Sequence, residues 1–254
     1  MITMNKGWWF AGFFLLVTII CIGTVQAGPV TVFSDDFNDN SLDTGKWTAD
    51  VVGTNNLFQE QNQRAEFTTY GPAAPGYHSL LRSQPVLIEG WETIEITGAW
   101  TSDSTTSRTY IARITDIDSS NFISIEYDSY LSNMDYFWKE GSSIVHVSRP
   151  PTSLVPFRLI ITKTGFEYYE NNVLLKSAPT SSMADATQFQ ILIGGWDYSA
   201  FIRHSYIDDI VVKASFPLTQ FPVSAPEFPS AFLPAMFVIG ILGTVFYIRS
   251  TRES

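Results

Sequence analysis

The sequence predicts an all-β protein of the sandwich or barrel type. Apolar residues alternate with polar ones at a period of two, and do not recur at the three- and four-residue spacing of a helix. In the segment 157–163, for example, Phe157, Leu159 and Ile161 share one face of an extended chain. No convincing amphipathic helix is visible between residues 28 and 215, and short strands at this spacing favour packed sheets.

The same alternation predicts seven further strands. In the segment 121–128, Ile123, Ile125 and Tyr127 share one face, which places Glu126 on the other. The six other predicted strands are 30–33, 93–100, 109–114, 143–147, 188–193 and 206–213.

One hairpin is predicted in addition. Its strands would be 165–170 and 173–176, joined by Asn171 and Asn172. Asparagine tolerates the positive φ angles that a two-residue hairpin turn demands.

This hairpin and both flanks of the region resemble concanavalin A-like lectin and glucanase domains, also described as LamG-like. The segment 35–47, from Asp-Asp-Phe to Gly-Lys-Trp, is similar to their opening, and 206–212 is similar to their closing strand. The resemblance implies a jelly-roll β-sandwich over roughly residues 30 to 215, and we expect residues 28–215 to form one domain.

The first 27 residues are expected to be a removable signal helix. Lys6 precedes a short apolar run, and Val25-Gln26-Ala27 is an acceptable cleavage pattern before Gly28. The run falls short of the roughly 20 residues of a comfortable membrane span, which is the alternative. The one cysteine, Cys21, lies in this run, so cysteine chemistry is not expected in the mature chain.

The C-terminal end predicts a membrane anchor. Residues 231–248 carry no charge, and as a transmembrane helix they would be about 27 Å long. Arginines in the end 249–254 place it in the cytoplasm, with the rest of the chain at the cell surface in type I topology. The proline-containing segment 216–225 suits an extended linker.

A short motif precedes this helix in residues 226–254. Pro-Glu-Phe-Pro-Ser, an apolar helix and terminal arginines resemble, in that order, the PEF-CTERM sorting signal of archaeal surface proteins. The resemblance implies processing by a membrane transpeptidase of the archaeosortase type; the alternative is a plain type I anchor. The motif residues are Pro226, Glu227, Phe228, Pro229 and Ser230.

One predicted strand bears on catalysis. Retaining glucanases of the resembled fold, of family 16, carry Glu-x-Asp-x-(x)-Glu on one strand and use the outer two carboxylates. Glu126 and Asp128 match the first two, but Tyr130 and Leu131 stand where the last glutamate would be. We therefore expect no glycosidase activity, and Glu126 and Asp128 are candidates for polar contacts to a sugar.

Sugar recognition also needs aromatic faces. Four aromatic residues fall near predicted strand ends or loops beside polar residues, and are the candidates for stacking on a carbohydrate. They are Tyr136, Trp138, Trp196 and Tyr198.

A structural calcium ion is a further possibility. Domains of the resembled fold often hold Ca²⁺ between the opening and closing strands, and the resemblance implies Asp36 and Asp209 as ligands. The alternative is that these acids cap strands and turns.

These observations predict a non-catalytic, anchored cell-surface protein with a lectin-like sandwich that binds carbohydrate. The alternatives are a glycoside hydrolase or lyase-like enzyme on the same fold, or an adhesive envelope protein that binds other proteins. Nucleic acid is not an expected partner, because the chain has a formal net charge of −10.

Overall fold

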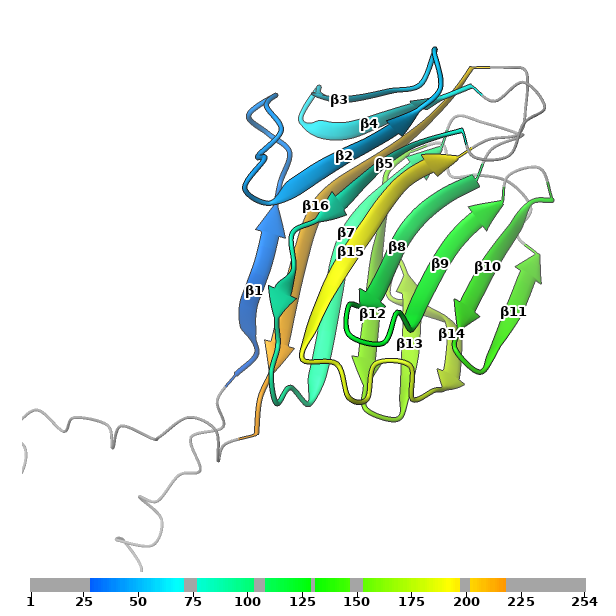
Figure 1. Cartoon of the computed structure of the whole chain (residues 1–254). Coiled ribbons are helices and arrows are strands. Elements are labelled where there is room, and N and C mark those ends of the chain that lie inside the picture. The colour runs from blue at the N-terminus through cyan, green and yellow to red at the C-terminus, as the bar shows by residue number, and fades with distance from the viewer. Residues whose placement is uncertain are drawn as a thin grey trace, which may run out of the picture. The chain divides into compact units, whose positions relative to one another are not determined.

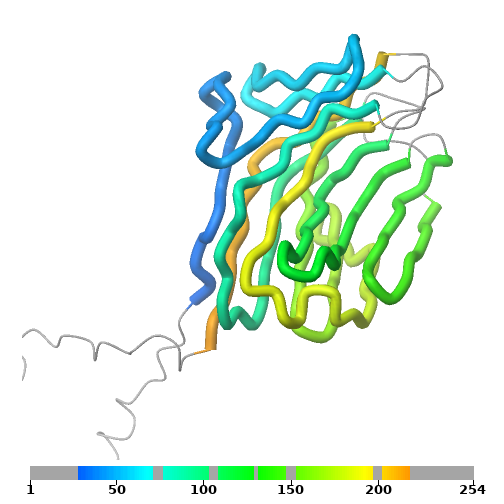
Figure 2. The backbone as a smooth tube through the Cα atoms, in the orientation of Figure 1, coloured from blue at the N-terminus to red at the C-terminus, as the bar shows by residue number. Residues whose placement is uncertain are grey.

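The computed structural model describes residues 28–70, 77–102, 108–128, 131–146, 153–196 and 202–217, which form two antiparallel β-sheets (Figures 1 and 2). In this part of the chain no helix is long and apolar enough to span a membrane. The predicted signal helix, sorting motif, transmembrane helix and cytoplasmic end lie outside the described residues, as does Tyr198.

The first sheet, sheet A, contains both the opening and the closing strand. Its strands are β1 (Val30–Asp35), β3 (Leu57–Gln61), β4 (Arg64–Thr69), β7 (Thr93–Ser102), β12 (Val155–Thr162), β13 (Gly165–Glu170), β14 (Val173–Pro179) and β16 (Arg203–Ser215). Their order is β14-β13-β12-β7-β16-β4-β3, with β1 also paired to β16.

The second sheet, sheet B, carries the candidate site. Its strands are β2 (Trp47–Val52), β5 (His78–Ser83), β6 (Val86–Leu87), β8 (Arg108–Asp116), β9 (Phe122–Asp128), β10 (Asn133–Trp138), β11 (Gly141–His146) and β15 (Gln188–Trp196). Their order is β11-β10-β9-β8-β15-β5-β2, and β6 pairs with β15. In Figure 1, β8 to β11 lie in front of β12 to β14.

Aromatic side chains from the two sheets meet in one core. Trp100 of β7 packs against Tyr127 of β9 with ring centroids 5.3 Å apart, and both rings are buried. Nearer the β10 side, Tyr136 packs edge-on against Tyr168 of β13 at 5.8 Å. These contacts identify which side chains of each strand face inward.

The predicted all-β sandwich is confirmed; alternation located eight of the sixteen described strands, and the hairpin prediction located two more. The hairpin prediction is confirmed as well, since Asn171 and Asn172 have φ angles of 48° and 63°. The sequence analysis missed β2, β3, β4, β5, β6 and β10. Of these, β3 and β2 are edge strands with several exposed positions, where burial imposes little apolar pattern.

Candidate active site

Strand β9 places two carboxylates on the face of sheet B that points away from the core. Ile123, Ile125 and Tyr127 are fully buried in the core, so the alternating residues Glu126 and Asp128 point to the other face. We call this the outer face of sheet B.

Pairing with the neighbouring strands completes a cluster around Glu126. Asp135 of β10 lies directly opposite Glu126, and Tyr110 of β8 lies opposite it on the other side. Arg108 of β8 lies opposite Asp128 in the same way. Directly opposed residues of an antiparallel pair have Cβ atoms about 4.5–5.5 Å apart, so Glu126 and Asp135 are close neighbours.

Arg108 holds the three carboxylates together. Its Nε donates to Asp128 Oδ2 at 2.9 Å, while Nη1 lies 3.9 Å from Glu126 Oε2 and Nη2 lies 3.8 Å from Asp135 Oδ2. All three carboxylate side chains are buried, whereas that of Arg108 is 29% exposed. The guanidinium therefore covers the three carboxylates on the solvent side. Arg108 and these three carboxylates are called the Arg108 cluster.

Two aromatic rings flank the Arg108 cluster on the β15 side. Trp196 of β15 pairs with Arg108, whose guanidinium carbon lies 5.2 Å from the indole centroid. Trp196 also stacks on Tyr110, with 6.3 Å between centroids and 17° between the ring planes. Burial raises the pKa of Tyr110 to about 12, so its hydroxyl stays protonated at neutral pH.

Strand β15 passes close to β5 at Gly194, two residues before Trp196. Gly194 of β15 stands opposite Tyr110 with φ +131°, and a Cβ there would lie 2.4 Å from Ser79 O of β5. Only glycine adopts this conformation without strain. The same Cβ would lie 3.0 Å from Cδ1 of Phe67, a core ring of β4, so a larger residue has no room at position 194.

Burial dominates the electrostatics of the Glu126 and Asp135 pair. It raises the pKa of Glu126, opposed by a hydrogen bond from Ser124 Oγ at 2.7 Å and by the charge of Arg108. It also raises the pKa of Asp135, again opposed by Arg108. Within the described residues, Asp135 Oδ1 has no hydrogen-bond partner, which further disfavours its charged form. Both carboxyls thus hold protons to a higher pH than usual.

The structure places the predicted aromatic candidates on different sides of sheet B. Trp196 lies on the outer face beside Arg108. Tyr136 is fully buried, and Trp138 packs against Phe166 of sheet A at 5.5 Å, so both face the core. The prediction that Tyr136 and Trp138 stack on a sugar is therefore corrected. Both residues occupy positions of β10 whose side chains point toward sheet A.

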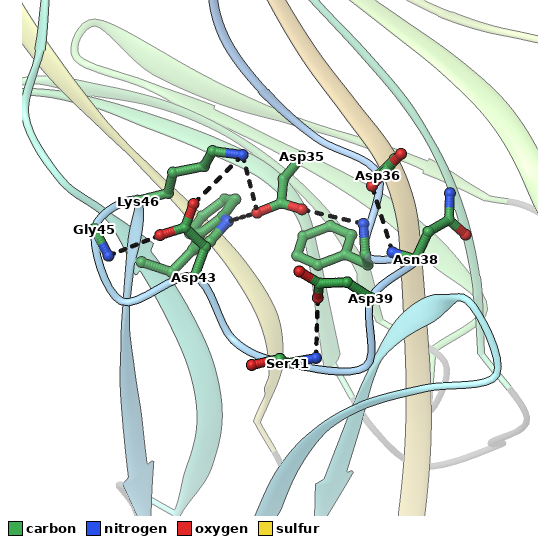
Figure 3. A network of polar contacts seen from close by, with 10 residues as sticks. Asp35, Asp36, Asn38, Asp39, Ser41, Asp43, Gly45 and Lys46 are labelled. Carbon is green, nitrogen blue, oxygen red and sulfur yellow. Dashed lines mark hydrogen bonds and ion pairs between the residues drawn. The ribbon is translucent and has the colours of Figure 1, made fainter.

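The opening turn engages most of its own carboxylates (Figure 3). Asp35 accepts hydrogen bonds from Phe37 N at 3.1 Å and Trp47 Nε1 at 2.8 Å, and Lys46 Nζ lies 3.9 Å from it. Asp36 accepts only a long hydrogen bond from Asn38 N, at 3.4 Å. This network joins β1 to the start of β2.

The two predicted calcium ligands, Asp36 and Asp209, both lie near Asp208. Asp209 lies in an irregular part of β16 with φ 52°, and the pKa of Asp208 is raised by burial and by the charges of Asp209 and Asp36. However, in the described ranges no group of three or more His, Cys, Asp or Glu could hold a metal ion. Calcium takes six to eight oxygen ligands, so these side chains alone do not make its site. The calcium stays a prediction.

Solved structures of glucanases share this fold. The catalytic domain of an endo-1,3-β-glucanase from Thermotoga petrophila is 12% identical with a TM-score of 0.55, over 75% of this chain and 99% of that one. A non-specific endo-β-1,3(4)-glucanase of family GH16 is 12% identical with a TM-score of 0.56, over 75% of this chain and 93% of that one. A Bacillus licheniformis β-glucanase is 14% identical with a TM-score of 0.52, over 75% of this chain and 99% of that one. No protein-family model and no curated protein sequence matches the chain.

These likenesses establish a jelly-roll sandwich of the GH16 type, in line with the predicted concanavalin A-like fold. The prediction of a non-catalytic, lectin-like protein is corrected, because solved structures that share this fold include glucanases and an endo-β-galactosidase. The prediction had considered a pair of carboxylates on a single strand only. It overlooked Asp135, Arg108 and Tyr110, which β8 and β10 bring to Glu126.

Proposed function

We propose that the protein is a glycoside hydrolase that cleaves β-linked polysaccharide at the Arg108 cluster. The observation that carries the proposal is the cross-strand pair of buried carboxyls, Glu126 and Asp135, on the outer face of sheet B. Asp135 takes the place of the glutamate missing from the end of the Glu126 strand. The glucanases that share the fold support the reaction class, and the β-glucans named as their substrates support the linkage.

Asp135 is the proton donor in this proposal. Its buried, unpartnered Oδ1 and its raised pKa favour the protonated acid, which general acid catalysis requires. It gives its proton to the glycosidic oxygen as the bond from that oxygen to the anomeric carbon breaks.

Glu126 is the nucleophile. Ser124 and Arg108 partly offset the burial that raises the pKa of Glu126, and its ionised carboxylate forms a bond to the anomeric carbon. Water then attacks that carbon, Asp135 accepts the proton of the water, and Glu126 is released. Carboxyl groups about 5–5.5 Å apart are typical of this double displacement, and directly opposed side chains suit that separation.

Trp196 and Tyr110 are placed to hold the sugar. The indole offers an apolar face for pyranose C–H groups, and the Tyr110 hydroxyl remains a hydrogen-bond donor because of its raised pKa.

Release of reducing ends tests this proposal with the full-length chain. The wild type is incubated with neutral β-glucans and with acidic β-linked polysaccharides. We expect new reducing ends, and a loss of about 10²–10⁴-fold in rate for both Glu126→Gln and Asp135→Asn. Asp185→Asn, at an exposed position, is the matched control and should keep the wild-type rate. Absence of cleavage with every polysaccharide, or full activity of Asp135→Asn, contradicts the proposal.

We further propose that the enzyme is exported and anchored at the cell surface, on the strength of the sequence at its two ends. Removal of the signal peptide would leave a mature chain that begins near Gly28. The motif 226–230 would direct an archaeosortase-type enzyme to cleave off the helix 231–248. Intact-mass measurement of the native protein from membranes should give a chain shortened at both ends. A species that still ends at Ser254 would support a plain transmembrane anchor instead.

A further inference from the structure

Two more arginines lie on the outer face of sheet B, beside the Arg108 cluster. Arg82 of β5 pairs with Leu192 of β15, which in turn pairs with Arg113 of β8. Arg113 is itself opposite Ser124 of β9. The two arginines thus belong to one row across the sheet, two residues along the strands from the row that contains Glu126.

Neither arginine forms an ion pair with a carboxylate in the part of the protein that the structure describes. Lys46, Arg64 and Arg108 all have carboxylate partners within 4.0 Å, whereas Arg82 and Arg113 have none among the described residues.

Arg113 is held in place by an aromatic ring and not by an acid. Its guanidinium carbon lies 3.9 Å from the centroid of Phe122, and its charge is near enough to lower the pKa of Glu126. Stacking fixes the plane of the guanidinium and leaves N–H donors at its edge for a ligand. Arg82, by contrast, is exposed.

The spacing of the row suits a chain lying across the strands. Arg82 and Arg113 are two strands apart, which corresponds to about 10 Å between their backbones. The buried side chain of Leu192 lies between them and gives the row an apolar floor. A polysaccharide that crosses the strands at the row of Glu126 would lie beside this row, about 7 Å from it along the strands, within reach of arginine side chains.

Charge identifies the kind of polysaccharide. A neutral glucan offers guanidinium groups only hydroxyl acceptors, whereas carboxylate and sulfate groups accept stronger, bidentate hydrogen bonds from their planar N–H donors. The chain as a whole has a net charge of −10 and would repel an acidic glycan, so local cations would be needed to bind one.

We propose that the substrate is an acidic polysaccharide, and that Arg82 and Arg113 bind acid groups on the sugar units next to the cleaved bond. This inference rests on the proposed glycoside hydrolase function, since it assigns the substrate of that site.

Binding to three forms of one β-1,3-glucan tests the inference: unmodified, carboxymethylated and sulfated. Affinity is measured by calorimetry on the full-length chain carrying Asp135→Asn, so that no substrate is consumed. We expect at least one acidic form to bind about tenfold tighter than the unmodified glucan, with less advantage at high salt. Preference for the carboxymethylated or for the sulfated form tells which acid group is recognised.

Arginine variants in the same background locate the binding. Arg82→Gln and Arg113→Gln should each remove most of the preference for the acidic form. Arg158→Gln is the matched control, because Arg158 lies on β12 of sheet A, where it stacks on Tyr169 at 4.4 Å, and the preference should survive. Equal binding of all three glucans, or a preference that both variants keep, overturns the inference.

The two proposals fail in different ways. Cleavage of neutral glucan by the wild type, without preferential binding of an acidic form, refutes the inference and leaves the glycosidase in place. Preferential binding that depends on Arg82 and Arg113, with no cleavage of any glucan by the wild type, refutes the glycosidase and supports the acidic-glycan site.

Discussion

Arg108 is the residue on which the candidate active site depends. Three buried carboxylates on adjacent strands would repel one another, and the guanidinium offsets that repulsion through contacts of 2.9–3.9 Å. Removing one partner of a buried ion pair leaves uncompensated charge, which proteins relieve by protonation. Arg108 therefore tunes the protonation of both proposed catalytic groups.

This role predicts a shift in the pH dependence of cleavage. Arg108 lowers the pKa of Glu126 and of Asp135, so Arg108→Gln should raise both and move both limbs of the kcat/KM profile to higher pH. Arg108→Lys keeps a cation and should shift the profile less. Thermal melting verifies that each variant is folded, and limbs that stay in place for folded Arg108→Gln would refute the tuning role.

Single aromatic residues show the limit of sequence reasoning at this scale. Tyr136 and Trp138 stand beside polar residues in the sequence, a context that is also typical of sugar-binding loops. Only the packing of sheet B on sheet A distinguishes the two cases, by placing these rings against Tyr168 and Phe166. Trp196 has a similar sequence context and yet lies on the outer face, because it pairs with Arg108.

At the scale of elements, the site depends on three neighbouring strands in register. Alternation within β9 was sufficient to predict that Glu126 and Asp128 share a face. The partners on β8 and β10 depend on strand pairing, and pairing includes an irregularity between Tyr110 and Ala112 that no sequence pattern indicates. Met134, Tyr136 and Trp138 alternate along β10 and face the core. Recognising that alternation in the sequence would have placed Asp135 on the outer face.

The contact of the opening turn with β3 gives a prediction about stability. Burial, together with Asp39, raises the pKa of Glu60 from its usual 4.5 to about 7. Between these values the folded protein keeps a proton that the unfolded chain has lost, so the free energy of unfolding falls as pH rises through the window.

Glu60→Gln should remove this dependence. Its unfolding free energy relative to the wild type should be higher at about pH 8 than at about pH 5, as measured by urea denaturation. Glu89→Gln changes an exposed glutamate and is the matched control. A difference between Glu60→Gln and the wild type that does not change with pH would contradict the assigned pKa.

At the scale of the whole molecule, the two-sheet sandwich could be predicted from the sequence and the candidate active site could not. Period-two alternation and the Asn171-Asn172 turn are local features, and the fold follows from them. The proposed catalytic pair joins residues 126 and 135 across two strands, so a motif sought on one strand could not reveal it. The fold shared with glucanases supplied the reason to look for a second carboxylate on that face.

The stereochemistry of cleavage tests the central claim most directly. Proton NMR spectra recorded in the first minutes of reaction show the anomeric configuration of the newly formed reducing end. A nucleophilic Glu126 with Asp135 as its close acid partner predicts that the β-configuration of the cleaved linkage appears first and then equilibrates. An α-anomer formed first would contradict the pair, since inversion requires carboxyls about 6.5–9.5 Å apart with a water between them.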